Sequence, residues 1–334
     1  MGIEVIKAGA LSLFQDGGRH GFQKLGVPVC GPMDEGAHRL ANLLVGNGED
    51  TATLEITLIG PTLRFTVPVC MALTGADLGA RLDDRPLALK RPLVARPGQV
   101  LRFAGGPAGM RAYLAVHGGF DLTPVLGSCS TYLRGGLGGL GGRALRRGDH
   151  VEPKVPLPSD PRFLREVERQ FWNIELYLPA RLGLIARDTL RVVKGPHWPL
   201  FSGNSIRDFL TADFRILPES DRMGYRISGP RLAVEEAAQI LSEATAFGAI
   251  QVPRGGDPIV LMADRQTMGG YPKIAHVAAV DLPALAQRRP GEFVHFELVP
   301  LERAQALDGM RDAAFAELRA RLAVVGDILS RGVS

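Results

Sequence analysis

The chain has 334 residues, of which 46% are hydrophobic and 22% are charged, so it has ample apolar material for a core and is not disordered as a whole. Its 39 Lys and Arg and 35 Asp and Glu residues give a net charge of +4. The positive charges form no block of the kind that binds nucleic acid. No apolar run reaches the roughly 18 residues that a membrane-spanning helix needs, so neither nucleic acid nor a membrane is an expected partner.

The cysteines and the start of the chain indicate a reduced, cytoplasmic protein. Residues 1–14 lack the charged and apolar regions of a secretory signal. Cys30, Cys70 and Cys129 are odd in number and widely spaced, so they form neither a CxxC pair nor a disulfide framework. We expect no disulfide and no essential cysteine nucleophile.

The first third of the chain predicts short β-strands and one helix. The 41 Gly and 24 Pro residues favour many turns. A helix is expected over 34–44, with Asp34 as its N-cap and Gly46 as its stop, because apolar residues recur at helical spacing from Ala37. Gly, Pro or Asp separates most of the strand candidates, as in a barrel or sandwich. These strands are 3–7, 11–15, 53–57, 62–66, 69–73, 100–103 and 111–116.

Residues 134–143 read RGGLGGLGGR and cannot form a regular helix or strand at low cost. Gly136, Gly138 and Gly141 match G-x-G-x-x-G, but no clear strand precedes them and no clear helix follows, so a dinucleotide fold is not favoured. The segment is interpreted as a flexible loop. It either lets the backbone approach a ligand or partner, or is simply a connector.

The second half of the chain predicts another β-rich region after a Pro-containing linker at 153–160. Helices are expected over 161–172 and 204–210, and a long one with an apolar stripe over 301–325. The expected strands are 189–193, 214–217, 249–252, 259–262 and 293–299. The expected domains are therefore 1–155, 156–300 and a C-terminal helix with its tail over 301–334.

A weak internal repeat links the two halves. Gly-Pro-Thr-Leu at 60–63 resembles Gly-Pro-Arg-Leu at 229–232, and Arg-Pro-Gly precedes a strand at both 96–98 and 289–291. The repeat predicts two related β units. The expected fold class is mainly β, with a few helices and a long C-terminal helix.

Several standard sites are missing. The chain has no Gly-Lys dipeptide and so no P-loop, and it has no G-x-S-x-G nucleophile motif. Its seven histidines are never within five residues of one another, so no local zinc signature exists and no metal site is expected. These absences predict that the chain is nearly inactive without partners.

Four polar clusters could carry chemistry. The first, at 15–19, places Asp16 and Arg19 around a Gly-Gly turn, as an ion pair or as a site. The second, at 30–34, precedes the first helix and is either an anion site or a plain cap. The third, at 220–226, has Asp221 available to orient Arg222, as a carboxylate or phosphate site or as a surface ion pair.

The fourth cluster, at 264–273, is the densest and follows an apolar run. Polar groups at the end of a core strand are a common place for a binding site, although the cluster could instead be a structural turn or a contact with a partner protein. We expect Asp264 to orient Arg265, and Arg265 and Lys273 to hold anionic groups. Gln266 and Thr267 would hydrogen-bond an amide. Gly269 and Gly270 would form a sharp turn that returns Tyr271 to the same mouth.

These clusters together resemble one family of carboxyltransferase-like proteins. It includes the C subunit of 5-oxoprolinase, the KipA-type antagonist of a kinase inhibitor, allophanate hydrolase subunit 2 and the C-terminal part of the urea carboxylase carboxyltransferase domain. Two departures are Cys129, where relatives often carry Arg, and Met268, where they often carry Thr. The motifs are GVPxxGxMD at 26–34, LExTxxGPxL at 54–63, LTGAD at 73–77, RxYLAVxGG at 111–119, LGSxST at 126–131, SDRMGYR at 220–226 and GAIQVP…GxPIVLMADRQTxGGYPKIAxV at 248–277.

The resemblance implies two cyclophilin-like β-barrel units. It also implies the C subunit of an ATP-dependent 5-oxoprolinase, which acts with a KipI-type B subunit and an A subunit to open the lactam of 5-oxoproline. ATP would be a co-substrate, together with Mg²⁺. The alternatives are the carboxyltransferase half of a urea or amide carboxylase, with biotin on a partner only, and a non-catalytic antagonist of a sensor-kinase inhibitor.

The expected site residues combine the polar clusters with the motif that ends at Asp77. The catalytic candidates are Asp264, Arg265 and Lys273, and the candidates for binding substrate or ATP are Asp16, Arg19, Asp34, Asp77, Asp221, Arg222, Gln266, Thr267 and Tyr271.

Overall fold

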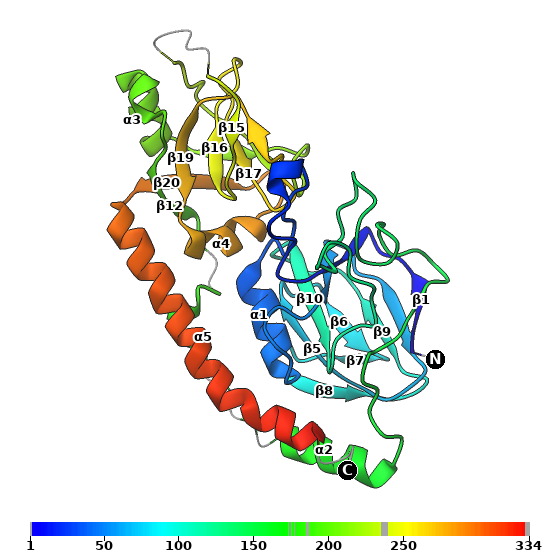
Figure 1. Ribbon diagram of the computed structural model, residues 1–334. Coiled ribbons are helices and arrows are strands. Elements are labelled where there is room, and N and C mark those ends of the chain that lie inside the picture. Colours follow the sequence, from blue (N-terminus) through cyan, green and yellow to red (C-terminus); the bar gives the residue numbers. More distant parts are fainter. Residues whose placement is uncertain are drawn as a thin grey trace. The chain divides into compact units, whose positions relative to one another are not determined.

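The computed structural model is mainly β and ends in a long helix (Figure 1). It describes residues 2–172, 174, 176, 178–184, 187–234 and 240–330. The chain divides into two compact units, which are described separately. Unit 1 comprises residues 1–19, 34–182 and 314–334, and unit 2 comprises residues 20–33 and 183–313. Among the described residues, no helix is long and apolar enough to cross a membrane.

Unit 1 is built from two antiparallel sheets whose buried side chains form one hydrophobic cluster. Alternating apolar residues such as Ile3 and Val5 on the first sheet, and Leu54 and Ile56 on the second, contribute to this cluster. The six-stranded sheet has the order β11 (His150–Val151), β1 (Ile3–Lys7), β4 (Thr62–Phe65), β9 (Val100–Phe103), β6 (Ala80–Leu82) and β7 (Arg85–Pro86). The five-stranded sheet has the order β2 (Leu11–Gln15), β3 (Thr53–Thr57), β10 (Arg111–Val116), β5 (Val69–Gly75) and β8 (Pro92–Ala95).

Helix α1 (Glu35–Leu44) packs on the five-stranded sheet, against β5 and β10. Its apolar face is buried, and Thr74 on β5 donates a hydrogen bond to the Ala37 carbonyl at 2.6 Å. The Asp34 side chain accepts from the Ala37 N–H at 2.9 Å and caps the helix. The predicted helix and its N-cap are therefore confirmed, and Gly46 follows the helix with a φ of 71°.

Unit 2 contains a closed seven-stranded barrel. Among the described strands of this barrel, only β12 and β20 pair in parallel; the other pairs are antiparallel. Phe209 stacks on Phe296 with ring centroids 4.6 Å apart, and helix α3 (Gly203–Thr211) thereby packs against the barrel. The barrel order is β12 (Thr189–Lys194), β19 (Lys273–Val277), β16 (Ala249–Gln251), β17 (Ile259–Leu261), β14 (Gly224–Ser228), β13 (Phe214–Ile216) and β20 (Phe293–Leu298).

The remaining helices are α2 (Pro161–Trp172), α4 (Leu282–Ala286) and α5 (Leu301–Ser330). Helix α2 is joined to unit 1 by an Arg96–Glu168 ion pair at 2.7 Å. The short helix α4 is buried within unit 2. Helix α5 begins in unit 2 and ends in unit 1. Its predicted apolar stripe is buried only from Ala314 onward, whereas Leu301 is exposed.

The expected fold class, mainly β with a few helices and a long C-terminal helix, is confirmed. Of the two expected β-barrel units, unit 2 contains a closed barrel, whereas the described strands of unit 1 form two sheets. Helices α1, α2, α3 and α5 and most of the longer strands were predicted to within a few residues, whereas helix α4 was missed. Strands β6, β7, β8, β11, β14 and β19 were missed, and so was the two-stranded sheet of β15 (Glu243–Ala244) and β18 (Met268–Gly269). The division at 155 and 300 stays a prediction, and its C-terminal tail at 331–334 lies outside the described residues.

One part of the internal repeat, Arg-Pro-Gly at 96–98 and 289–291, forms the same turn in both places. Gly98 and Gly291 have φ values of 89° and 93°, so both Arg-Pro-Gly segments place a left-handed glycine after proline. In both, the side chain of the following residue, Gln99 or Glu292, accepts from the N–H of the arginine three positions earlier, at 2.8 and 2.9 Å. The Gly-Pro repeat is not structural, because 62–65 is a strand and 231–232 is not.

Candidate functional site

A buried ion pair joins the third and fourth polar clusters within unit 2. Arg222 donates to both carboxylate oxygens of Asp264, at 3.0 Å through Nε and 2.8 Å through Nη2. Both side chains are about 95% buried. The pairing of β14 with β17 continues past the ends of both strands, since the Asp264 N–H donates to the Arg222 carbonyl at 2.8 Å. The two motifs therefore meet because their strands pair.

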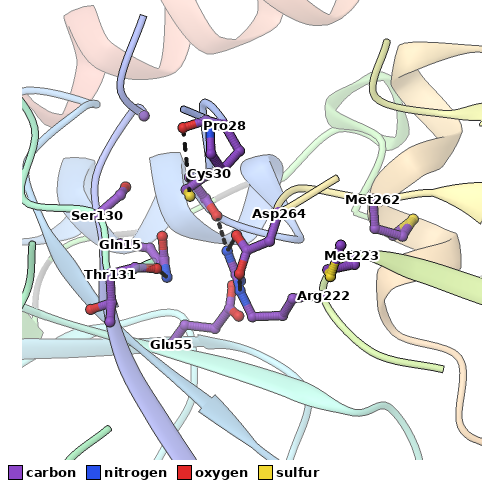
Figure 2. A network of polar contacts seen from close by, with 12 residues as sticks. Gln15, Pro28, Cys30, Glu55, Ser130, Thr131, Arg222, Met223, Met262 and Asp264 are labelled. Atoms are coloured by element: carbon purple, nitrogen blue, oxygen red, sulfur yellow. Dashed lines mark hydrogen bonds and ion pairs between the residues drawn. The ribbon is translucent and has the colours of Figure 1, made fainter. Parts of the chain in front are cut away.

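The same guanidinium holds the loop at 27–33, which belongs to unit 2. Arg222 Nη2 donates to the Gly31 carbonyl at 2.6 Å. The loop turns through two residues with positive φ, 62° at Cys30 and 87° at Gly31. Figure 2 shows Arg222 extended between Asp264 and this loop. The bidentate pair fixes the guanidinium in one orientation.

The expected role of Asp221 as the partner of Arg222 is wrong. Its carboxylate instead accepts from the N–H groups of Met223 and Gly224, at 2.8 and 3.2 Å, and so closes a local turn. The expected pairing of Asp264 with Arg265 is also wrong, because both carboxylate oxygens of Asp264 accept from Arg222, whereas the Arg265 guanidinium donates to the Met262 carbonyl. Asp264 pairs instead with Arg222, which lies across from it where the pairing of β14 with β17 continues.

Arg265 is more loosely held. Its Nη1 lies 3.5 Å from the Met262 carbonyl, its guanidinium carbon lies 5.8 Å from the centre of the Phe247 ring, and its buried Nε has no hydrogen-bond acceptor among the described residues. Burial lowers the pKa of this guanidinium, although nearby Cys30 and Asp264 act to raise it. A partly buried cation with an unused, buried Nε donor is suited to an anionic ligand.

Residues 266–271 form strand pairing rather than the expected glycine turn. Met268–Gly269 is strand β18, and the Thr267 carbonyl accepts from the Thr245 N–H at 3.1 Å. The Gln266 amide donates to Gln251 Oε1 at 3.2 Å. Gly269 is needed for close approach, because a Cβ there would lie 2.6 Å from Gln251 Nε2. Tyr271 is 48% exposed.

Lys273 has partners that the sequence did not suggest. Its Nζ donates to Glu243 Oε1 at 2.5 Å, and its backbone N–H donates to His197 Nδ1 at 3.1 Å. The hydrogen bond from Lys273 lowers the pKa of Glu243, although burial opposes it. Burial and Lys273 lower the pKa of His276. Glu243 and His197 lie 30 and 76 positions away in sequence, so only the tertiary fold identifies them.

In unit 1, Asp16 organises the segment at 128–130. Its carboxylate accepts from Ser128 Oγ at 2.6 Å, from Ser130 Oγ at 2.7 Å and from the Cys129 N–H at 2.5 Å. Burial acts to raise the pKa of Asp16, but these hydrogen bonds outweigh it and lower the pKa. Asp16 therefore remains a carboxylate that holds this segment in place.

Arg19 supports the same segment but does not form the expected ion pair with Asp16. Its side chain is fully buried and donates to the carbonyls of Val125, Ser128 and Ser130, at 2.9, 3.3 and 2.9 Å. Gln15 Nε2 donates to the Thr131 carbonyl at 3.1 Å, and Figure 2 shows these two residues side by side. The first polar cluster thus fixes the backbone of the LGSxST motif.

The other two predicted acidic residues of unit 1 are found at backbone caps. Asp34 caps α1, so the cluster at 30–34 includes a plain cap. Asp77 is exposed and accepts from the Gly79 N–H at 2.8 Å. Ligand contacts for Asp34, Asp77 and Asp221 stay a prediction.

The glycine-rich segment forms a series of tight turns that line a pocket in unit 1. Two isolated bridges, Tyr132–Leu137 and Leu140–Arg143, fasten it to itself. The pocket has a volume of about 340 Å³, and its wall includes Asp121, Thr123 and most of the glycines at 136–142. The segment is therefore more than a connector, and ligand binding there stays a prediction.

All three cysteines are free, which confirms the absence of a disulfide. Burial raises the pKa of the Cys70 thiol, and burial followed by the charge of Asp16 raises that of Cys129. We expect Cys129→Ser to retain full turnover in the assembled enzyme, and thiol reagents to label both residues far more slowly in the folded chain than in urea. Mass spectrometry of alkylated protein measures this, and a Cys129→Ser variant that folds but does not turn over would contradict it.

A buried histidine in unit 1 gives an expected pH dependence of stability. His38 Nδ1 lies 2.8 Å from Thr53 Oγ1, and its buried Nε2 has no hydrogen-bond partner among the described residues. Burial lowers its pKa from 6.5 to about 4, against the nearby carboxylates, which raise it. Between these values the unfolded chain binds more protons, so stability falls as the pH falls from 6.5 to 4, by about 3 kcal/mol in total.

The His38→Asn variant should lose most of this pH dependence, since it keeps a polar atom near Thr53 but has no ring to protonate. Urea unfolding of both proteins between pH 4.5 and 7 measures the two slopes. Parallel slopes would show that His38 is not the titrating group.

The arrangement is suited to recognising a polar anion. The described residues include no group of His, Cys, Asp or Glu that could hold a metal ion. Cations and amides dominate the fourth cluster and the neighbouring Gln251. The donors belong to Arg265, Gln266, Gln251 and Lys273. The buried nitrogens Arg265 Nε and Gln251 Nε2 have no acceptor in the described part of the chain. Such donors match carboxylate, phosphoryl and amide oxygens.

Comparisons with known proteins identify relatives over nearly the whole chain. Residues 25–298 match the family described as carboxyltransferase domain, subdomain A and B. The chain is 39% identical to the C subunit of 5-oxoprolinase from Escherichia coli K12 over 320 residues, which cover 96% of this chain and 98% of that protein. It is 32% identical to urea amidolyase of Lachancea kluyveri over 333 residues, which cover 94% of this chain and 18% of that protein.

A solved structure with a similar fold is that of the K. lactis urea amidolyase. It matches with a TM-score of 0.83 and 29% identity, covering 95% of this chain and 20% of the other. The chain thus spans about a fifth of the length of these yeast proteins.

Proposed function

Because the chain belongs to the carboxyltransferase domain family, subdomain A and B, we propose that it is the corresponding component of an ATP-dependent 5-oxoprolinase. The observation that carries this proposal is the match to the E. coli 5-oxoprolinase C subunit, which is 39% identical and covers nearly the full length of both proteins. In the yeast proteins the same fold is about a fifth of a longer chain. That supports a need for partners, which we propose are the A and B subunits of the same enzyme.

The proposed reaction converts 5-oxo-L-proline, ATP and water to L-glutamate, ADP and phosphate. A lactam is a poor electrophile, and transfer of a phosphoryl group to its carbonyl oxygen would create a good leaving group. A first water attacks the activated carbon and the ring C–N bond breaks, with the nitrogen taking up a proton, which leaves an acyl phosphate. A second water then hydrolyses the acyl phosphate to the glutamate carboxylate and free phosphate. Positioned cations and amide donors are what such a reaction needs.

We propose that Lys273 and Arg265 hold the anionic groups of the ligands, and that Gln266 and Thr267 contact the amide. The support for Arg265 is its buried Nε, which has no acceptor among the described residues. Arg222 and Asp264 act as positioning residues, since each satisfies the other and together they hold the loop at 27–33. Mg²⁺ enters bound to ATP, and a cytoplasmic location stays a prediction.

The experiment that tests the function compares two substrates in one assembled complex. The chain is co-produced with the A and B subunits of the enzyme, and glutamate release is measured with 5-oxo-L-proline and ATP. In a second arm, urea and carboxybiotin replace 5-oxo-L-proline and ATP, and the formation of carboxylated urea is measured. We expect turnover in the first arm and none in the second.

The opposite outcome would favour carboxyl transfer, which is the second candidate. The observation in its favour is the 32% identity to the L. kluyveri urea amidolyase together with the TM-score of 0.83 to the K. lactis protein. In that case biotin would be carried by a partner, and this chain would transfer a carboxyl group to an amide nitrogen.

A further inference from the structure

Two buried polar side chains that are far apart in sequence lie close together in the unit 2 barrel. Gln251 ends β16 and Lys273 begins β19, and their Cα atoms are partners in the antiparallel ladder. The register shifts between Ile250 and Gln251, so the side-chain contacts rather than the ladder bring the two polar groups together. Gln251 Nε2 lies beside Gly269, where an added Cβ would be 2.6 Å away, and Gly269 pairs with Glu243, which accepts from Lys273. Gln251 is 1% exposed and Lys273 is 2% exposed. Figure 1 shows β16 and β19 as neighbours in the barrel.

This pair presents more donors than the described residues can accept. The Lys273 ammonium has three N–H donors, and its hydrogen bond within the described structure goes to Glu243. The buried Gln251 Nε2 has no acceptor there. The Gln251 carbonyl accepts from Gln266 Nε2, so the nitrogen of the same amide is the group left over. Unused buried donors are costly unless a ligand completes them.

Glu243 is much more exposed to solvent than Lys273, with which it forms an ion pair. Its side chain is 43% exposed, whereas that of Lys273 is 3% exposed, and it lies on the two-residue strand β15. His197 faces the same carboxylate, with Nε2 3.7 Å from Glu243 Oε1, and its Nδ1 accepts from the Lys273 backbone. A half-exposed carboxylate can move into solvent at little cost, but the buried ammonium then needs another anion.

We propose that Lys273 and Gln251 form an oxyanion subsite in which the Glu243 carboxylate occupies the place of a ligand carboxylate or phosphoryl group. The ligand's oxygens accept from Lys273 Nζ and Gln251 Nε2, and Glu243 swings out as they enter. The inference deepens the proposed function and rests on it for the identity of the ligands. Those ligands offer both sources of the same chemistry, since 5-oxo-L-proline carries a carboxylate and ATP carries phosphoryl groups.

The test measures dissociation constants by calorimetry on the full-length chain, alone and with its partners. The probes are 5-oxo-L-proline and ATP in separate arms. Lys273→Met and Gln251→Leu should each weaken one probe about ten- to a hundredfold, as expected for the loss of a hydrogen bond to a charged group. The probe that is weakened identifies the source of the oxyanion. Lys194→Met is the matched control, because Lys194 is an exposed lysine on the adjacent strand β12 and should change neither constant.

Glu243→Gln gives the sharper result, and it is a substitution at a half-exposed site that the fold should tolerate. A neutral amide competes less well for Lys273, so the same probe should bind several-fold more tightly than to the wild-type chain. Unchanged or weaker binding in Glu243→Gln would overturn the stand-in role. The subsite would be overturned if the wild-type, Lys273→Met and Gln251→Leu chains bound both probes with equal affinity. It would also be overturned if none of these chains bound either probe.

The outcome is separable from that of the proposed function. Lack of glutamate release by a complex that still binds a probe through Lys273 and Gln251 counts against the reaction and not against the subsite. Normal glutamate release by complexes containing Lys273→Met or Gln251→Leu counts against the subsite and not against the reaction.

Discussion

Replacing Asp264 by alanine should lower the free energy of unfolding of unit 2 by about 3–5 kcal/mol, because it removes the carboxylate that forms two charge-assisted hydrogen bonds with a buried guanidinium. The Arg222 guanidinium loses two hydrogen bonds, at 3.0 and 2.8 Å, while its side chain remains 95% buried. The loop at 27–33 should loosen at the same time, since the same guanidinium holds Gly31. In a Trp172→Phe background, urea unfolding followed by tryptophan fluorescence measures the change in unit 2, because Trp198 is then the one tryptophan of the sequence.

Two further variants distinguish the effect of breaking this buried ion pair from a general loss of stability. Asp221→Ala removes a carboxylate one position from Arg222, but one that closes an exposed turn, so it should cost only about 1 kcal/mol. The Arg222→Met, Asp264→Leu double variant removes both charges and should be more stable than Asp264→Ala. Equal costs for Asp264→Ala and Asp221→Ala would show that the pair contributes little.

The second large effect is expected on catalysis. Lys273→Met and Arg265→Met should each lower kcat/KM of the assembled complex about ten- to a hundredfold, because each removes a charged hydrogen bond to a ligand. Methionine keeps much of the length of each buried stem, so the melting temperature should change by only a few degrees. Turnover, thermal unfolding and co-purification with the partners are measured on the same samples, with Lys194→Met as the control.

These measurements distinguish a ligand site from a structural or contact role. A structural role would lower the melting temperature. A role in binding a partner protein would abolish co-purification, while any remaining complex turned over normally. Normal turnover of both variants in an intact complex would end the assignment of Lys273 and Arg265 to the site.

Local sequence predicted the parts of the fold that local physics controls. The helix at 35–44 has an N-cap, an apolar face and a stopping glycine, and all three are in place. Strands β3, β5 and β10, which are rich in apolar residues, were also predicted. The two-residue strands β15 and β18 were missed because pairing with each other, rather than composition, makes them strands.

The candidate site was predicted by residue type but not by pairing. Asp264 and Arg265 are adjacent in sequence, yet Asp264 pairs with Arg222, 42 positions away, because the pairing of β14 with β17 continues to these two residues. Glu243 and Gln251 lie outside the densest motif and reach it only through the ladders of β15 with β18 and of β16 with β19. Partners of this kind follow from strand register, which a single sequence does not specify.

The most direct test of the account is ATP-dependent glutamate release from 5-oxo-L-proline, measured for the purified chain alone and after addition of the A and B subunits. The account predicts almost no turnover by the chain alone, because its sequence has no P-loop and no G-x-S-x-G nucleophile motif, and robust turnover once the partners are present. Robust turnover by the chain alone, or none by the full complex, would contradict it.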